Sequence, residues 1–140
     1  DLAKCFPDQV SVTIGYNEAL SHQIMAGCDI FIMPSRFEPC GLNQMYGLRY
    51  GTPPVVTYTG GLADSVQDTN EASLKNKSAT GFVMKKADPN ELVSAVGKAL
   101  SYYQDEKTWK EIQENGMRQN LDWTKSAKAY MAMYEEILKK

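Results

Sequence analysis

The chain has 140 residues, of which 43% are hydrophobic and 23% are charged, as is ordinary for one soluble globular domain or part of one. The net charge of −2, with lysines scattered through the second half, argues against a nucleic-acid partner. No apolar run reaches the roughly 18 to 20 residues that cross a bilayer, and no signal peptide opens the sequence, so we expect no membrane partner and a cytosolic or stromal location.

Local patterns in the first part of the chain alternate between strand and helix. Residues 1–7 read like the end of a helix without its start and lack an initiator Met, so we expect a fragment of a longer protein. Residues 10–14 alternate apolar and polar side chains, which predicts a short strand. Asn17 can cap a helix that ends at Gly27, and the apolar residues 30–33 predict a buried parallel strand.

The alternation continues with a helix over residues 41–50, ended by Gly51, and a strand over residues 55–57. Parallel strands require such helical crossovers, so the first 60 residues predict half of a doubly wound α/β domain. Ligands of these sheets bind at the edge where the loops after the strands gather.

Helices replace the sheet later in the chain. We expect a loop at residues 60–64, a polar and mobile segment at 68–78, and a last strand at 80–84. Asp88, Pro89 and Glu91 together give a strong helix start. Thr108 with Glu111 predicts another capped start, and apolar residues from Ala127 onward repeat at helical spacing to the end. Residues 1–86 are therefore the α/β part and 87–140 the C-terminal helices.

Residues 34–44 are the most informative stretch for function. Glu38 follows a strand and lies shortly before the Gly41-opened helix start. An ionised carboxylate accepts hydrogen bonds, as from sugar hydroxyls, while a helix start offers unpaired N–H groups to an anion. The pairing predicts a site for a sugar attached to phosphate. The alternative is an exposed loop carboxylate, and the adjacent helix start favours the functional reading.

Few other residues suggest chemistry. Cys5, Cys28 and Cys40 are odd in number and lack metal-ligand spacing, so we predict reduced thiols and neither a metal nor a cofactor. His22, the sole histidine, is expected to pack or hydrogen-bond.

Three ordered motifs, in residues 15–22 (GYNEALSH), 35–56 (SRFEPCGLNQMYGLRYGTPPVV) and 59–66 (TGGLADSV), closely resemble the bacterial glycogen synthase and plant starch synthase family. The resemblance implies a glycosyltransferase-B fold, with residues 1–140 as part of its C-terminal nucleotide-sugar-binding domain. It implies retaining transfer of glucose from ADP-glucose to the non-reducing end of an α-1,4-glucan, which the missing N-terminal domain would bind. A plant parent would act in the plastid.

The resemblance also assigns roles to residues of the central motif. Glu38 would hold the donor glucose and support positive charge at the anomeric centre, as the catalytic residue. Backbone N–H groups of Gly41 and Leu42 would meet the diphosphate. Cys40 would lie close to the donor, although an isolated cysteine is more often a packed thiol.

Outside that loop, Tyr16 matches the aromatic residue on which adenine stacks; alternatively it is a strand-end tyrosine half packed on the core. Gly60 and Gly61 would approach the donor closely, or else form a turn that needs positive φ. Tyr46 lies where related enzymes often carry a second Glu, and contact with ribose is the corresponding expectation.

Parts of the family's site are absent from the sequence. Its phosphate-clamping Arg and Lys, five residues apart, do not occur, and Tyr58 stands where its K-x-G-G loop needs Lys. We therefore expect the isolated chain to be inactive and to bind ADP weakly at most. Two alternatives remain open: a related retaining enzyme that uses a UDP- or GDP-sugar, and a non-catalytic nucleotide-binding module.

Overall fold

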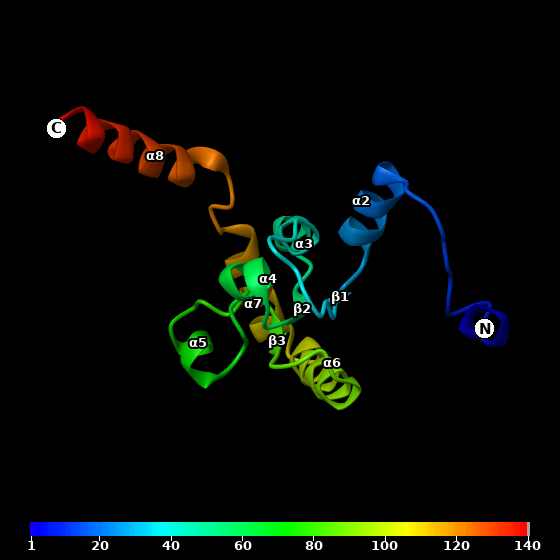
Figure 1. Cartoon of the computed structure of the whole chain (residues 1–140). Helices are drawn as coiled ribbons and strands as arrows, with labels where there is room; N and C mark the ends of the chain where they lie inside the picture. Colours follow the sequence, from blue (N-terminus) through cyan, green and yellow to red (C-terminus); the bar gives the residue numbers. More distant parts are fainter. Residues whose placement is uncertain (140) are drawn as a thin grey trace.

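The structure, a computed structural model, describes residues 1–139. Over these residues three parallel strands form one sheet, in which β2 (Pro54–Thr57) lies between β1 (Phe31–Met33) and β3 (Phe82–Met84) (Figure 1). The three strands predicted at residues 30–33, 55–57 and 80–84 are thus confirmed. β1 is less buried than predicted, because it pairs with β2 alone and leaves Ile32 44% exposed.

Side-chain caps and glycine stops set the ends of several helices. Helix α2 (Glu18–Gly27) begins where Asn17 accepts a hydrogen bond from the Leu20 N–H. Helix α3 (Asn43–Tyr50) ends at Gly51, whose φ of 77° is the left-handed conformation that glycine adopts at low cost. Both stretches were predicted to be helical.

The long helix α6 (Pro89–Tyr103) has the predicted start. The carboxylate of Asp88 accepts hydrogen bonds from the N–H groups of Asn90 and Glu91, with Pro89 at the first helical position. Glu91 does not close a capping box on this helix. Its carboxylate accepts instead from the N–H of Lys85 and Lys86, which fastens the helix start to the chain leaving β3.

The sheet is covered on both faces, because successive strand residues point to opposite sides. Val55 belongs to the larger of two apolar clusters, to which α6 and α7 (Glu106–Met117) contribute. Val56 belongs to the smaller, formed with α3 and α4 (Gly60–Ser65). The larger cluster comprises Val55, Ala79, Phe82, Met84, Ala95, Ala99, Trp109 and Ile112; the smaller comprises Leu48, Val56, Leu62 and Val66.

The strand predicted at residues 10–14 is wrong for this structure. These residues form no strand, and Ile14 is 96% exposed. A strand requires a neighbour to accept and donate its ladder hydrogen bonds, and the described residues supply none here. The segment runs between α2 and the short helix α1 (Leu2–Cys5), which lies away from the sheet at the blue end of the chain (Figure 1).

The loop predicted at residues 60–64 is wrong, because these residues are helical and form most of α4. The polar segment at residues 68–78 contains the helix α5 (Glu71–Lys75), which carries a reciprocal capping box: Asn70 Oδ1 accepts from Ser73 N–H, and Ser73 Oγ accepts from Asn70 N–H. Several polar side chains of this segment thus form local hydrogen bonds, while its expected mobility stays a prediction.

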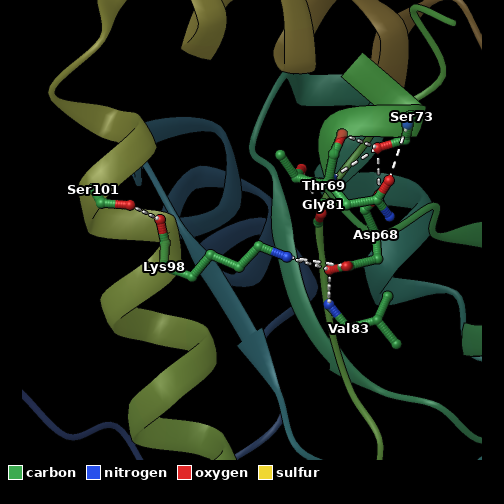
Figure 2. Close-up of polar contacts among 8 residues, drawn as sticks. Asp68, Thr69, Ser73, Gly81, Val83, Lys98 and Ser101 are labelled. Carbon is green, nitrogen blue, oxygen red and sulfur yellow. Dashed lines mark hydrogen bonds and ion pairs between the residues drawn. The ribbon is translucent and has the colours of Figure 1, made fainter. Parts of the chain in front are cut away.

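Asp68 explains why this polar segment is held against the sheet. Figure 2 shows its carboxylate accepting from Lys98 Nζ of α6 at 3.0 and 3.2 Å and from the Val83 N–H of β3 at 3.0 Å. Asp68 therefore satisfies a backbone donor on the outer edge of β3 and ties that edge to α6. Nearby, Thr69 Oγ1 donates to the Gly81 carbonyl at 2.8 Å (Figure 2).

The last two helices begin at aspartates. Asp105 caps α7, whereas the sequence had suggested a start at Thr108, which is the third helical residue and donates to Asp105. Asp122 caps α8 (Trp123–Leu138), which projects away from the sheet (Figure 1). Every residue of α8 is exposed, and Lys140 lies outside the described residues. Across residues 1–139 no helix has the length and apolar character to cross a membrane.

Candidate functional site

Two loops that are far apart in sequence meet at the carboxyl edge of the sheet. Residues 38–41 follow β1, and Gly60 and Gly61 open α4 after β2. The Gly61 N–H donates to the Glu38 carbonyl at 3.3 Å. Since parallel neighbouring strands end at the same edge, the loops after them are brought side by side. The structure thus brings Glu38 and Cys40 beside the Gly-Gly pair.

The Gly-Gly pair allows the backbones of these loops to touch. A Cβ at Gly60 would overlap the Glu38 carbonyl, and one at Gly61 would overlap the carbonyl of Cys40. Gly60 also has φ of 43°. Gly60 therefore has the positive φ of the predicted turn, and the close approach at both glycines is to the protein's own loop. Contact of Gly60 and Gly61 with the donor stays a prediction.

Gln44 and Ser65 brace the same junction, and sequence reasoning gave neither a role. Gln44 is fully buried, and its Nε2 lies within hydrogen-bond distance of the carbonyls of Cys40 and Gly41 and of Ser65 Oγ. Ser65 Oγ donates in turn to the Gly61 carbonyl at 2.6 Å. The available signal was spacing, because Gln44 lies four residues after Cys40 and Ser65 four residues after Gly61.

The Glu38 carboxylate is free to receive a ligand. The residue is partly buried, yet its side chain accepts no hydrogen bond from any residue between 1 and 139. Its backbone, by contrast, is fixed through the bond from Gly61. Cys40, two residues on, is exposed. The arrangement presents an acceptor group without an internal partner, on a loop whose backbone is bonded to Gly61.

The start of α3 also lacks an internal partner. The helix begins at Asn43, two residues later than predicted, with Leu42 as its N-cap and no side-chain cap. Side-chain carbonyls or carboxylates cap α2, α5, α6, α7 and α8. The first N–H groups of α3 therefore keep their capacity to bind an anion. The prediction named the N–H of Leu42, and the observed helix start adds the N–H of Asn43.

Tyr46 lies on the next turn of α3. Its ring packs against His22 with centroids 4.9 Å apart, and His22 Nδ1 lies 3.1 Å from the Tyr50 hydroxyl. His22 therefore packs and hydrogen-bonds, as predicted. Tyr46 and Leu42 also line a groove of about 530 Å³ between α3 and the linker to α8. One predicted diphosphate contact and the predicted ribose contact thus share a groove.

Tyr16 is more exposed than Leu42 or Tyr46. It lies in the irregular segment before α2 and is 92% exposed, so the reading as a half-packed core tyrosine is wrong. Its ring has a free face, but the segment that carries it has no strand neighbour in the described part of the chain. The predicted stacking role stays a prediction.

Residues 1–139 contain no group of three or more His, Cys, Asp or Glu side chains placed to hold a metal ion. Cys5, Cys28 and Cys40 are unpaired. Burial raises the pKa of the Cys28 thiol, which therefore stays protonated near neutral pH.

Comparison with known proteins places the chain in a family. The family described as "Glycosyl transferases group 1" matches residues 3–119. The chain belongs to the group 1 glycosyl transferases. Among curated relatives, the glycogen synthase of Dechloromonas aromatica is 53% identical over 138 residues, covering 99% of this chain and 28% of that protein. The glycogen synthase of Cellvibrio japonicus is 54% identical over 139 residues, covering 98% and 28% respectively.

A solved structure agrees with this family assignment. The catalytic domain of starch synthase IV from Arabidopsis thaliana, bound to ADP and acarbose, matches with a TM-score of 0.87 and 37% identity, over 99% of this chain and 29% of that one. The likeness confirms the predicted α/β fold class, a doubly wound Rossmann-like domain of the glycosyltransferase-B kind with C-terminal helices. This glycosyl transferase chain spans just over a quarter of the length of the relatives it matches.

Proposed function

We propose that the chain is part of the C-terminal, nucleotide-sugar-binding domain of a retaining glucosyltransferase that moves glucose from ADP-glucose to the end of an α-1,4-glucan. Residues 1–86 supply the α/β part and residues 87–140 the C-terminal helices. Membership in the group 1 glycosyl transferases and relatives named glycogen synthase support the reaction class. The solved relative with bound ADP and acarbose supports an adenine nucleotide and an oligosaccharide as the two ligands.

The observation that carries the proposal is the junction of two loops around Glu38. A carboxylate without an internal partner lies a few residues before an uncapped helix start, and Gly60 and Gly61 let the two loops touch. In the proposed site the diphosphate meets the N–H groups of Gly41 and Leu42, close to Cys40, and also that of Asn43. The Glu38 carboxylate then accepts hydrogen bonds from glucose hydroxyls.

Glu38 contributes most as the glucosyl–phosphate bond breaks. Positive charge then grows at the anomeric carbon and negative charge grows on the departing diphosphate. A carboxylate near the first charge and helix N–H groups near the second stabilise both at once. Because the two groups belong to one loop, their separation changes little during the reaction.

The chain carries one side of the proposed cleft. Tyr16, proposed to stack on adenine, and Tyr46, proposed to contact ribose, both have exposed side chains in this structure. The Arg and Lys of the expected phosphate clamp are absent from the sequence. We therefore propose that glucan binding and charge neutralisation need the rest of a longer enzyme, and that the 140 residues alone neither elongate glucan nor bind ADP tightly.

The test uses Glu38→Gln in the full-length enzyme that carries this chain. Gln keeps the size of the side chain but removes the negative charge that stabilises the developing cation. We expect kcat with ADP-glucose to fall by about 100-fold or more, while the Kd for ADP changes by less than about threefold. Glucan elongation and ADP titration calorimetry measure the two quantities.

Glu71→Gln is the matched control, since Glu71 is an exposed glutamate at the start of α5. It should leave both constants unchanged. Near-normal turnover of Glu38→Gln would reject the catalytic role. Turnover of UDP-glucose or GDP-glucose in place of ADP-glucose would reject the proposed donor, and failure to transfer glucose from any of them would favour a non-catalytic nucleotide-binding module.

A further inference from the structure

The side chain of Gln44 connects the two loops of the candidate site through a short chain of hydrogen bonds. Its Nε2 lies 3.1 Å from the Cys40 carbonyl, 2.9 Å from the Gly41 carbonyl and 3.1 Å from Ser65 Oγ. Ser65 Oγ then donates to the Gly61 carbonyl at 2.6 Å. The bonds thus run from the loop after β1 to the first turn of α4, which follows β2.

The contacts of Gln44 Nε2 with both loops leave the other polar atom of its amide without a hydrogen bond. The residue is completely buried, and its Oε1 has no partner among the described residues. Rotating the amide by half a turn would not help, because Oε1 would then face the carbonyl oxygens of Cys40 and Gly41. The buried acceptor is left unpaired so that the amino group can reach both loops.

The same amide restricts the residue beside it. A Cβ at Gly41 would lie 2.5 Å from Gln44 Oε1, and Gly41 has φ of 71°. The loop therefore depends on glycine at position 41 both for its backbone conformation and for the space that the buried amide occupies. Gln44, in the first turn of α3, thus packs against Gly41, which lies two residues before the helix.

We propose that Gln44 is a positioning residue for glucosyl transfer, which fixes the loop of Glu38 on the start of α4 through Ser65. The inference rests on the proposed function of Glu38. Its physical basis is the set of contacts that Gln44 Nε2 and Ser65 Oγ make with the two loops, which we call the clamp. None of these contacts involves ADP-glucose, yet together they determine where the Glu38 carboxylate and the α3 N–H groups lie. A displacement of about 1 Å at such groups can lower a rate by about 100-fold.

Gln44→Met in the full-length enzyme removes the side-chain N–H groups of Gln44 and keeps a side chain of similar length. We expect kcat with ADP-glucose to fall by about 30- to 100-fold, with KM changed by less than about threefold. Ser65→Ala, a milder change, should lower kcat in the same direction. Gln113→Met is the matched control, because Gln113 in α7 is a glutamine whose Nε2 donates to a backbone carbonyl, that of Gly51, at 2.7 Å. It should affect thermal stability and leave kcat unchanged.

A double-mutant cycle separates positioning from general destabilisation. If Gln44 acts through Glu38, Gln44→Met should lower kcat much less in a Glu38→Gln background than in the wild type. Independent effects that multiply would overturn the proposal. So would a wild-type kcat for Gln44→Met in an enzyme whose Glu38→Gln variant is impaired.

Amide hydrogen exchange supplies a readout that does not depend on turnover. The Gly61 N–H donates to the Glu38 carbonyl, so Gln44→Met should accelerate its exchange by about tenfold or more, while Gln113→Met should not. Unchanged exchange would overturn the clamp itself. Failure of wild-type glucose transfer together with faster exchange would overturn the proposed function and, with it, the positioning role, while leaving the clamp as a structural feature.

Discussion

The loop junction at residues 38–41 and 60–61 contrasts with the segment at residues 10–16. The junction lies at the end of a paired sheet and is held by backbone contacts that only glycine allows. The earlier segment has apolar side chains at strand spacing but no strand beside it, and Ile14 and Tyr16 are almost wholly exposed. Both segments carry residues of the proposed site.

The contrast shows that an alternating sequence pattern does not by itself make a segment form a strand. The alternation of Val10, Val12 and Ile14 indicates which face of a strand would be buried, but burial requires a second element to cover that face. At the junction the second element is present, since α3 and α4 pack on β2. The packing of each part of the proposed site thus depends on which helices and strands lie beside it.

The largest expected effect comes from removing core atoms under the junction. Leu62 in α4 is completely buried, so Leu62→Ala should lower the free energy of unfolding of the chain by about 2–5 kcal/mol. Ile14→Ala removes a side chain of the same size from the open segment and should change it by less than about 0.5 kcal/mol. Urea unfolding followed by Trp109 fluorescence measures both.

The background for this measurement is Trp123→Phe, because the chain has two tryptophans and Trp123 lies in the exposed helix α8. Trp109 stacks on Phe82 in the core and reports its unfolding. Equal losses for Leu62→Ala and Ile14→Ala would show that residues 10–16 are packed in solution, which would remove the contrast.

A smaller effect is expected from filling the space between the two loops. Gly61→Ala places a Cβ against the Cys40 carbonyl, and relief requires the loops to separate. We expect a loss of about 1–3 kcal/mol in the free energy of unfolding. Gly97→Ala is the matched control, because Gly97 is an exposed residue of α6 with open space at its Cβ position.

Gly97→Ala should stabilise the chain by about 0.5–1 kcal/mol, because alanine has the higher helix propensity. The same urea unfolding experiment measures both glycine variants. If Gly61→Ala proved as benign as Gly97→Ala, the two loops would not touch as described.

Sequence patterns predicted the elements whose signals are local. Asn17, Gly51 and the Asp88 start marked helix ends correctly, since each acts through hydrogen bonds or backbone conformation within one turn. The start of α7 was misplaced because Thr108 resembles a cap, while Asp105, three residues earlier, makes the capping bond.

Features that depend on distant residues were not predictable in this way. The contacts of Asp68 could not be predicted, because its partners, Lys98 and Val83, lie 30 and 15 residues away. Gln44 gave a local signal through its spacing from Cys40, but its bond to Ser65, 21 residues away, could not be read from the sequence. In the candidate site the resemblance predicted a ligand-binding loop around Glu38, but the contacts that hold this loop became visible only in three dimensions.

The smallest expected effect concerns acid stability and compares the caps of α7 and α8. Hydrogen bonds from Thr108 lower the pKa of Asp105 below its ordinary value of 3.8, and hydrogen bonds from Thr124 do the same for Asp122. A lowered pKa in the folded state means that the carboxylate stabilises the fold fully above pH 3.8, and that this contribution is lost as pH falls through the folded-state pKa.

Only the cap of α7 should register in unfolding of the core, because α7 places Trp109 and Ile112 there and α8 buries nothing. Asn caps helices nearly as well as Asp but does not titrate in this range, so Asp105→Asn should flatten the fall of the urea midpoint between about pH 5 and pH 2.5. Asp122→Asn should leave that slope unchanged when Trp109 fluorescence is followed. A slope altered equally by both variants would mean that α8 packs on the core and unfolds together with it.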